Sequence, residues 1–172
     1  MIHGAFFMNK FLIVGLGNIG DEYTHTRHNI GFDILDYFVN KHKASFSADR
    51  LASVATVSIK GRKIICIKPT TFMNLSGRAV KYWLDKEKIE ISNLLVLVDE
   101  LAVPIKKIKM KPAGSDGGHN GLKDIIEKVG EDFVRFRVGI KNEQESKIPA
   151  EDFVLQKFSK SEQAELPEVI EK

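Results

Sequence analysis

The stretch Phe11-Leu12-Ile13-Val14-Gly15-Leu16-Gly17-Asn18-Ile19-Gly20 places four apolar residues directly before a turn that holds three glycines. A short apolar run that ends in glycine is typical of a strand buried on both faces of a sheet. Similar runs recur along the chain and alternate with segments of helical periodicity. The stretch therefore predicts the first strand of an α/β sheet.

The remaining elements follow from the same patterns. Strands are expected at 54–59, 63–67, 93–98, 104–111 and 134–140, and helices at 30–39, around 80–84, at 122–129 and from Ser161 onward. Gly61-Arg62 separates the first two of these strands and predicts a hairpin, which makes the sheet mixed. We predict the α/β class: a single-domain, three-layer α/β/α sandwich with a mixed, mostly parallel twisted sheet across residues 1–172.

Composition limits the possible functions. The 172 residues include 26 Lys and Arg and 23 Asp and Glu, a net charge of +3, which excludes a polycation. The only cysteine, Cys66, allows neither an intrachain disulfide nor a cysteine zinc site, so a cytoplasmic protein is expected. Apolar runs fall far short of the ~20 residues of a membrane span. Residues 1–7 precede Met8 and are expected to be a mis-assigned start or a non-native extension.

The glycines at 15, 17 and 20 match the dinucleotide-binding fingerprint, but the surrounding sequence does not. That motif needs a helix to begin inside it, and here the polar segment 21–27 intervenes. It also needs an acidic residue after a second strand about 20 residues on, and residues 38–45 contain neither. A nucleotide cofactor is therefore not expected.

Polar residues gather where apolar elements end, which suggests a site beyond the carboxyl ends of the strands. The group consists of Asn18, His28-Asn29, Asn74, Asp99 and Gly117-Gly118-His119-Asn120. A histidine can accept a proton near pH 7, and a carboxylate behind it fixes its tautomer. Ser76 and Ser115 lack the turn of a serine nucleophile, and Cys66 lies in an apolar run. The pattern favours attack by water with histidine as general base.

Five segments resemble the bacterial peptidyl-tRNA hydrolase family in order and spacing, over roughly residues 10–160. They are Ile13–Asn18, Tyr23 with Thr26–Asn29, Lys68–Gly77, Val98–Leu101 and Gly117–Asp124. The resemblance implies cleavage of the ester between a peptide and the 3′-ribose of tRNA, without metal or cofactor. It further implies a cytoplasmic monomer with no obligate protein partner.

Carried over by motif, His28 would activate water and Asp99 would hold it in its basic form. Asn18 would distinguish N-blocked from free aminoacyl-tRNA, and Asn74 and Asn120 would bind the peptide backbone and the water. The remaining expected substrate contacts are Tyr23, Phe72, Met73, Gly117 and His119.

Several of these residues have a structural alternative. Met73 could belong to the core, Asn74 could cap a helix, and Asn29 is expected mainly to begin one. The glycines before His119 could form only a turn, although they would also let a substrate backbone approach closely. His25 and His28 could form a metal pair with Asp99, which is disfavoured because the residues between them lack helical character.

Two strands present alternating basic residues. Lys107, Lys109 and Lys111 share one face of their strand, and Arg135 and Arg137 oppose the apolar residues of theirs. Beside a tRNA substrate these faces predict phosphate contacts from Lys107, Lys109, Lys111 and Arg137.

The sequence departs from the family's pattern at Ile19, where proline is frequent, and at Ala102, where an acidic residue is frequent. The chain ends at Lys172, so a C-terminal helical segment is expected to be shortened. Two rival functions stay open: a catalytically silent relative that binds RNA, and a hydrolase of small carboxylic esters.

Overall fold

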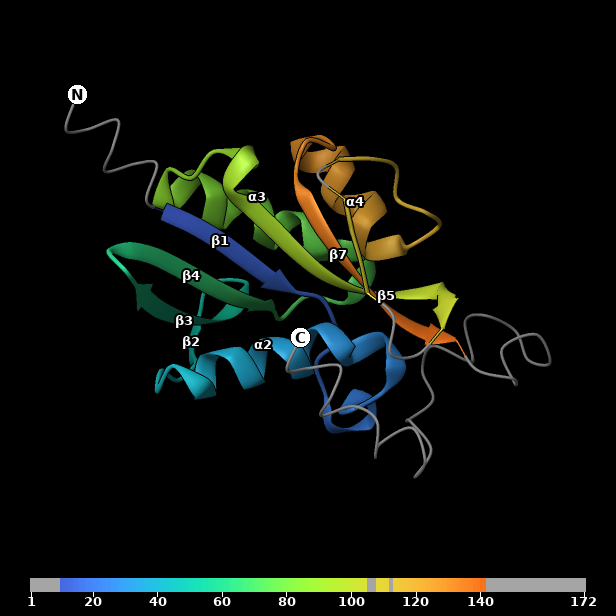
Figure 1. Ribbon diagram of the computed structural model, residues 1–172, viewed down its shortest axis with the longest axis horizontal. Coiled ribbons are helices and arrows are strands. Elements are labelled where there is room, and N and C mark those ends of the chain that lie inside the picture. The colour runs from blue at the N-terminus through green and yellow to red at the C-terminus, as the bar shows by residue number, and fades with distance from the viewer. Residues whose placement is uncertain (1–9, 105–107, 112, 142–172) are drawn as a thin grey trace.

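A computed structural model describes residues 10–104, 108–111 and 113–141. Within them seven strands form one sheet in the order β2-β3-β4-β1-β5-β7-β6 (Figure 1). The strands are β1 Lys10–Gly15, β2 Ser47–Asp49, β3 Ala52–Ile59, β4 Arg62–Pro69, β5 Leu94–Pro104, β6 Ile108–Lys111 and β7 Val134–Lys141. The predicted helix from Ser161 and the region around Met8 lie outside the described residues.

The described helices are α2 Ile30–Lys41, α3 Ser76–Glu87 and α4 Asn120–Val129. Short 3-10 turns are η1 Asp21–Tyr23, η2 Arg27–Asn29, η3 Met73–Leu75 and η4 Ile91–Asn93. None of these helices combines the length and apolar character needed to span a membrane.

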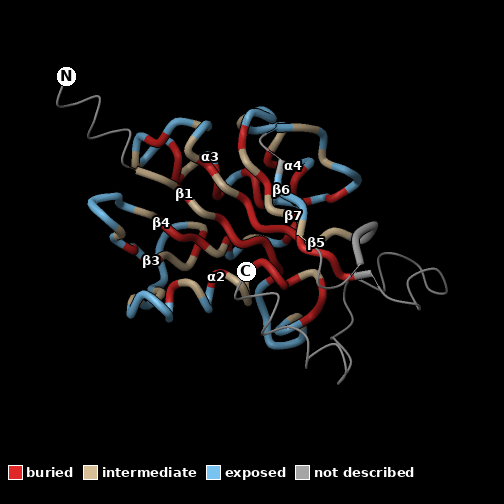
Figure 2. Tube along the Cα trace, in the orientation of Figure 1, coloured by how far each residue is buried: buried red, intermediate tan, exposed pale blue. Residues whose placement is uncertain are grey.

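The helices cover both faces of the sheet, as Figure 1 shows with α3 and α4 on one side and α2 on the other. Leu12 and Val14 pack with the residues of α3 and α4, whereas Ile13 packs with those of α2. This alternation is the period of two expected for a strand buried on both faces. Figure 2 shows the buried residues concentrated in the central strands. The predicted three-layer α/β/α sandwich is confirmed.

The sheet is mixed and mostly parallel, as predicted. β1 pairs in parallel with β4 and β5, and β5 pairs in parallel with β7. The other pairings are antiparallel. Lys60 and Gly61, at φ 50° and 79°, form the two-residue turn of the predicted β3–β4 hairpin, one residue earlier than expected.

Helix α2 lies close to the sheet because its second residue, Gly31, is a glycine. A Cβ at Gly31 would lie 2.5 Å from the carbonyl oxygen of Leu97 and 2.7 Å from the amide nitrogen of Leu16. Any larger residue would push α2 away from the carboxyl ends of β1 and β5. The turn η2, directly before α2, is thereby held against the sheet.

Candidate active site

An aspartate in the middle of the central strand β5 forms the centre of the site. Leu97 packs on the α2 side of β5, so Asp99, two residues later, faces the same side and meets η2. Asp99 is 3% exposed, which is rare for a carboxylate without partners. Its partners are two histidines, His28 on η2 and His119 directly before α4.

His28 and Asp99 form a hydrogen-bonded pair. Nδ1 of His28 lies 2.9 Å from both carboxylate oxygens of Asp99. Nε2 of His28 has no partner among the described residues, and its side chain stays 13% exposed. The sequence-predicted pairing of these residues therefore has the geometry of a base held by a carboxylate.

The second histidine lies on the other side of the carboxylate. Nε2 of His119 lies 2.7 Å from Oδ1 of Asp99, and the two imidazole rings are 5.1 Å apart between centroids. Burial by itself raises the pKa of Asp99, but the charges and hydrogen bonds of His28 and His119 outweigh it and hold that pKa below the ordinary value. Asp99 is therefore ionised throughout the neutral range.

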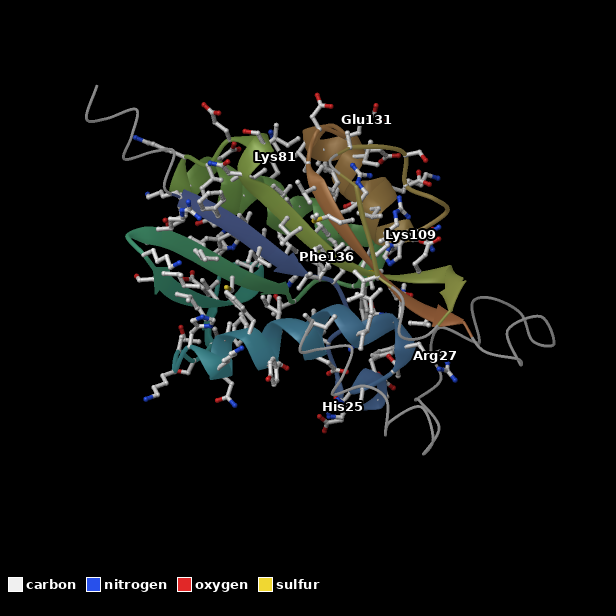
Figure 3. All side chains as sticks on the ribbon, viewed as in Figure 1. His25, Arg27, Lys81, Lys109, Glu131 and Phe136 are labelled. Carbon is white, nitrogen blue, oxygen red and sulfur yellow. The ribbon has the colours of Figure 1, made fainter. Side chains whose placement is uncertain are left out.

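The three side chains also form a possible donor set for a metal, with ligand atoms within 4.8 Å of one another in the described structure. The metal pair weighed from the sequence was different, because it used His25. His25 is exposed and bonds Asp33 at 3.0 Å instead (Figure 3). The alternative of His25, His28 and Asp99 is therefore wrong, and the distances around Asp99 are those of hydrogen bonds.

Asn18 is fixed by two neighbours. The side chain of Asn29 accepts from the backbone N–H of Asn18 at 2.8 Å and donates to its carbonyl at 2.9 Å. Oδ1 of Asn18 in turn accepts from the backbone N–H of Met73 at 2.6 Å. Asn29 thus stands at the N-cap position of α2 without capping it, and it anchors Asn18 instead.

Met73 belongs to the core beneath this loop. It is buried in the cluster shared by β1, α3 and α4. A Cβ at Gly121 would lie 2.7 Å from its sulfur and 3.0 Å from the ring of His119. The turn η3 and the start of α4 therefore touch each other beside the site.

Asn74 and Asn120 lie on those two elements, in η3 and at the first position of α4. Both are exposed, and neither side chain bonds to another described residue. Asn74 does not cap α3, which rules out its structural alternative. The rings of Tyr23 and Phe72 lie 6.5 Å apart between centroids in an edge-on arrangement. Phe72, two residues before Asn74, is 53% exposed.

The basic residues of β7 differ from expectation. Arg135 and Arg137 are 0% and 7% exposed, so the predicted open basic face of this strand is wrong. Arg135 donates to the carbonyls of Gly114, Ser115 and Glu131 at 2.6–2.9 Å. The loop before His119 covers the strand and uses the arginines as internal donors.

Arg137 donates to Glu100 and to the carbonyl of Ser115, both at 2.9 Å. A phosphate contact would require it to leave both partners. Gly117, at φ 60°, packs on Arg137, where a Cβ would lie 2.5 Å from the guanidinium. This glycine is needed for its backbone conformation and for that close contact.

The edge strand β6 is open to solvent. Lys109 is exposed, and so is Met110 on the opposite face, at 64%. The backbone of Lys111 pairs with that of Arg135. Lys107 lies outside the described residues.

A cavity of about 300 Å³ opens on the far side of Asn18. Its lining includes Asn18, Asn29, Phe32, Asp33 and Lys68, but neither His28 nor Asp99. The cavity therefore adjoins the site through Asn18 and Asn29.

Sequence reasoning missed that His119 is a partner of Asp99 and that Asn29 anchors Asn18. No local pattern indicates either pair, because His119 and Asp99, like Asn29 and Asn18, meet only through the fold.

Comparison with known proteins agrees with this geometry. The family model described as peptidyl-tRNA hydrolase matches residues 12–172. A peptidyl-tRNA hydrolase of Cytophaga hutchinsonii is 46% identical over 164 residues, 95% of this chain and 87% of that protein. One of Bacteroides fragilis is 52% identical over 135 residues, 78% of this chain and 72% of that protein. The crystal structure of the Acinetobacter baumannii peptidyl-tRNA hydrolase superposes with a TM-score of 0.87 at 34% identity, covering 95% of this chain and 84% of that one.

Proposed function

We propose, since the chain belongs to the peptidyl-tRNA hydrolase family, that it hydrolyses the ester between the carboxyl end of a peptide and the 3′-ribose of tRNA. The observation that best supports this is the His28–Asp99 pair. Nδ1 of His28 is bonded to Asp99, and Nε2 of His28, which has no partner among the described residues, can accept a proton. The expected metal-free reaction uses the side chains of this chain alone.

The first step is the activation of water. Asp99 accepts a hydrogen bond from the Nδ1–H of His28, so the lone pair of His28 lies on Nε2 and points outward. A water molecule bound there gives its proton to Nε2 as its oxygen attacks the ester carbonyl. Asp99 stabilises the resulting imidazolium and remains ionised.

The second step is collapse of the tetrahedral intermediate. The carbonyl double bond re-forms, the bond to the ribose oxygen breaks, and the imidazolium returns its proton to that oxygen. One water is consumed, a peptide acid and a free tRNA hydroxyl are released, and His28 is again neutral.

Substrate recognition falls to the asparagines around this pair. Because Oδ1 of Asn18 is occupied by Met73, its amide N–H groups are the part available to a substrate carbonyl. The exposed amides of Asn74 and Asn120 can both donate and accept, as an extended peptide backbone requires. Tyr23 and Phe72 offer aromatic surface to the substrate beside them.

The body of the tRNA would meet the edge of the sheet. Lys109 is the exposed cation described on β6, and Lys107 and Lys111 are proposed to act with it. Translation by-products are found in the cytoplasm, and we expect the protein to act there as a monomer without an obligate protein partner.

The decisive experiment follows release of the N-acetylated amino acid from N-acetyl-aminoacyl-tRNA, beside the unblocked aminoacyl-tRNA. The wild type is expected to cleave the blocked substrate only. His28→Ala should lower kcat by roughly 10²–10⁴-fold, the usual contribution of a general base. His42→Ala is the matched control, because His42 is exposed at the end of α2 and the described partner of its side chain is Phe38.

Two outcomes contradict the proposal. A folded wild type that binds tRNA without cleaving it would be an RNA-binding protein. Rapid turnover of an N-acetylated aminoacyl ester that lacks tRNA would indicate a hydrolase of small esters.

A further inference from the structure

His119 makes hydrogen bonds through both ring nitrogens, although it was expected only as a substrate contact. It stands at the N-cap of α4 with an extended backbone, at φ −82° and ψ 120°, and it is 9% exposed. A buried ring with both nitrogens engaged has little freedom to rotate, and each bond limits where its protons can lie.

One nitrogen caps the helix. Nδ1 accepts from the backbone N–H groups of Gly121 and Leu122, at 3.0 and 3.3 Å. A backbone N–H can only donate, so Nδ1 must be unprotonated. The neutral ring therefore keeps its proton on Nε2.

The other nitrogen faces the carboxylate. Nε2 lies 2.7 Å from Oδ1 of Asp99, the oxygen that also lies 2.9 Å from Nδ1 of His28. The helix cap thus turns His119 into a donor aimed at Asp99. Protonating Nδ1 would set its N–H against two backbone N–H groups, so the cap also opposes formation of a second imidazolium.

We propose that His119 is a positioning residue for the hydrolysis described above. The cap holds His119 in its Nε2–H form, and the hydrogen bond from this N–H has two effects. It fixes the carboxylate of Asp99, and it draws part of the negative charge of that carboxylate away from His28. The first effect keeps Nε2 of His28 aimed at water. The second reduces the negative charge that Asp99 presents to His28.

The environment of Asp99 fits this arrangement. The described side chains that hydrogen-bond Asp99 are His28, from η2, and His119, from the start of α4. The next ion pair along β5, between Glu100 and Arg137, bonds the loop at Ser115. Without His119, Asp99 would face His28 alone.

Two substitutions separate the bonds of His119. In His119→Asn the amide oxygen replaces Nδ1 as the cap acceptor, but the side chain does not reach Asp99. In His119→Gln the amide nitrogen replaces Nε2 as the donor, but the cap acceptor is lost. Each variant keeps one bond.

The inference rests on the proposed function, so cleavage of N-acetyl-aminoacyl-tRNA by the wild type is measured first, and its absence would refute that function. With an active wild type, His119→Asn should keep its Tm and lose about tenfold to a hundredfold in kcat. The acid limb of its pH profile should move to higher pH, because Asp99 then holds the His28 proton more strongly. His119→Gln should keep most of kcat. Its Tm should fall by a few degrees, because the loss of a helix cap lowers stability by about this amount.

Other results would overturn the inference. Wild-type kcat and pH profile in His119→Asn would make His119 a helix cap only, and a raised KM with unchanged kcat would make it a substrate contact. The tautomer is testable in the wild type by ¹⁵N NMR of its imidazoles, even where a variant does not fold. A proton found on Nδ1 of His119 at neutral pH would refute the proposal.

Discussion

Two neighbouring strands at one side of the sheet carry basic residues in the same alternation, and they use them in opposite ways. On β7, Arg135 and Arg137 are buried and bonded to carbonyls and to Glu100. On β6, Lys109 pairs in register with Arg137 yet remains exposed. The difference arises because the loop at 113–118 covers β7, whereas nothing described covers β6.

The same contrast separates the charges of the active site from those of the surface. Asp99 is buried with two donors, so a change there alters chemistry or stability. Lys109 is exposed, so its attraction to phosphate is weakened by salt. Buried charges should therefore show large effects that do not depend on salt, and exposed ones small effects that do.

The largest effect is expected for Asp99→Asn. An asparagine can donate to Nδ1 of His28, which moves the proton of His28 to Nε2 and removes the base. We expect kcat to fall by roughly 10²–10⁴-fold with little change in KM, measured on N-acetyl-aminoacyl-tRNA. Asp85→Asn, exposed on α3, is the matched control. Undiminished kcat in Asp99→Asn would mean that His28 does not depend on Asp99.

The same variant should also change the response to acid. The pKa of Asp99 is lowered by folding, so its ionisation stabilises the protein above the ordinary value of about 3.9 and this stabilisation is lost as pH falls below it. Urea denaturation below pH 4 should show a steeper loss of stability in the wild type than in Asp99→Asn. Equal slopes would show that Asp99 has the same pKa folded and unfolded.

The next largest effect is expected for Arg135→Met. The substitution removes one donor each from the carbonyls of Gly114, Ser115 and Glu131, and Gly114 then has no other described donor. It also removes a guanidinium that stacks 4.2 Å from the centre of the Phe133 ring. We expect a loss of about 2–4 kcal/mol in the free energy of unfolding by urea denaturation. Arg62→Met, at the exposed hairpin, should change it by no more than about 0.5 kcal/mol.

Arg137→Met tests the same contrast beside the active site. It leaves the carboxylate of Glu100 without its described partner and removes one of the two arginine donors to the carbonyl of Ser115, for an expected loss of about 1–3 kcal/mol. The slope of log Kd for tRNA against log salt should not change, because Arg137 is occupied internally. A shallower slope would show that Arg137 leaves Glu100 to bind phosphate.

Much of this fold follows from the sequence because its central strands are continuous apolar runs. Such runs identify β1 and β5 and, with the helical periods, the layers around them. The strand β2 was missed because all three of its residues are exposed and have no apolar pattern. The asparagine and histidine positions came from motifs, whose spacing is local.

What the sequence could not provide is the covering of one element by another. The alternation of residues on β7 correctly places the arginines and Val138 on opposite faces of the strand. It cannot show that a loop lies over the face with the arginines. Likewise His119 was recognised as a site residue, but its bonds to α4 and to Asp99 depend on how the helix meets the sheet. Contacts between distant segments decide such roles, and one sequence does not show them.

The smallest effect is expected for Lys109→Ala, which tests the exposed side of the comparison. Lys109 lies on the edge strand, apart from Lys81 on α3 (Figure 3). Losing one phosphate contact should make the salt dependence of tRNA binding shallower by about one unit and leave unfolding within about 0.5 kcal/mol of wild type. Lys81→Ala removes an equally exposed charge and should leave the slope unchanged. If the two variants behave alike, β6 does not face the tRNA, and the difference between β6 and β7 would be one of burial without a role in binding.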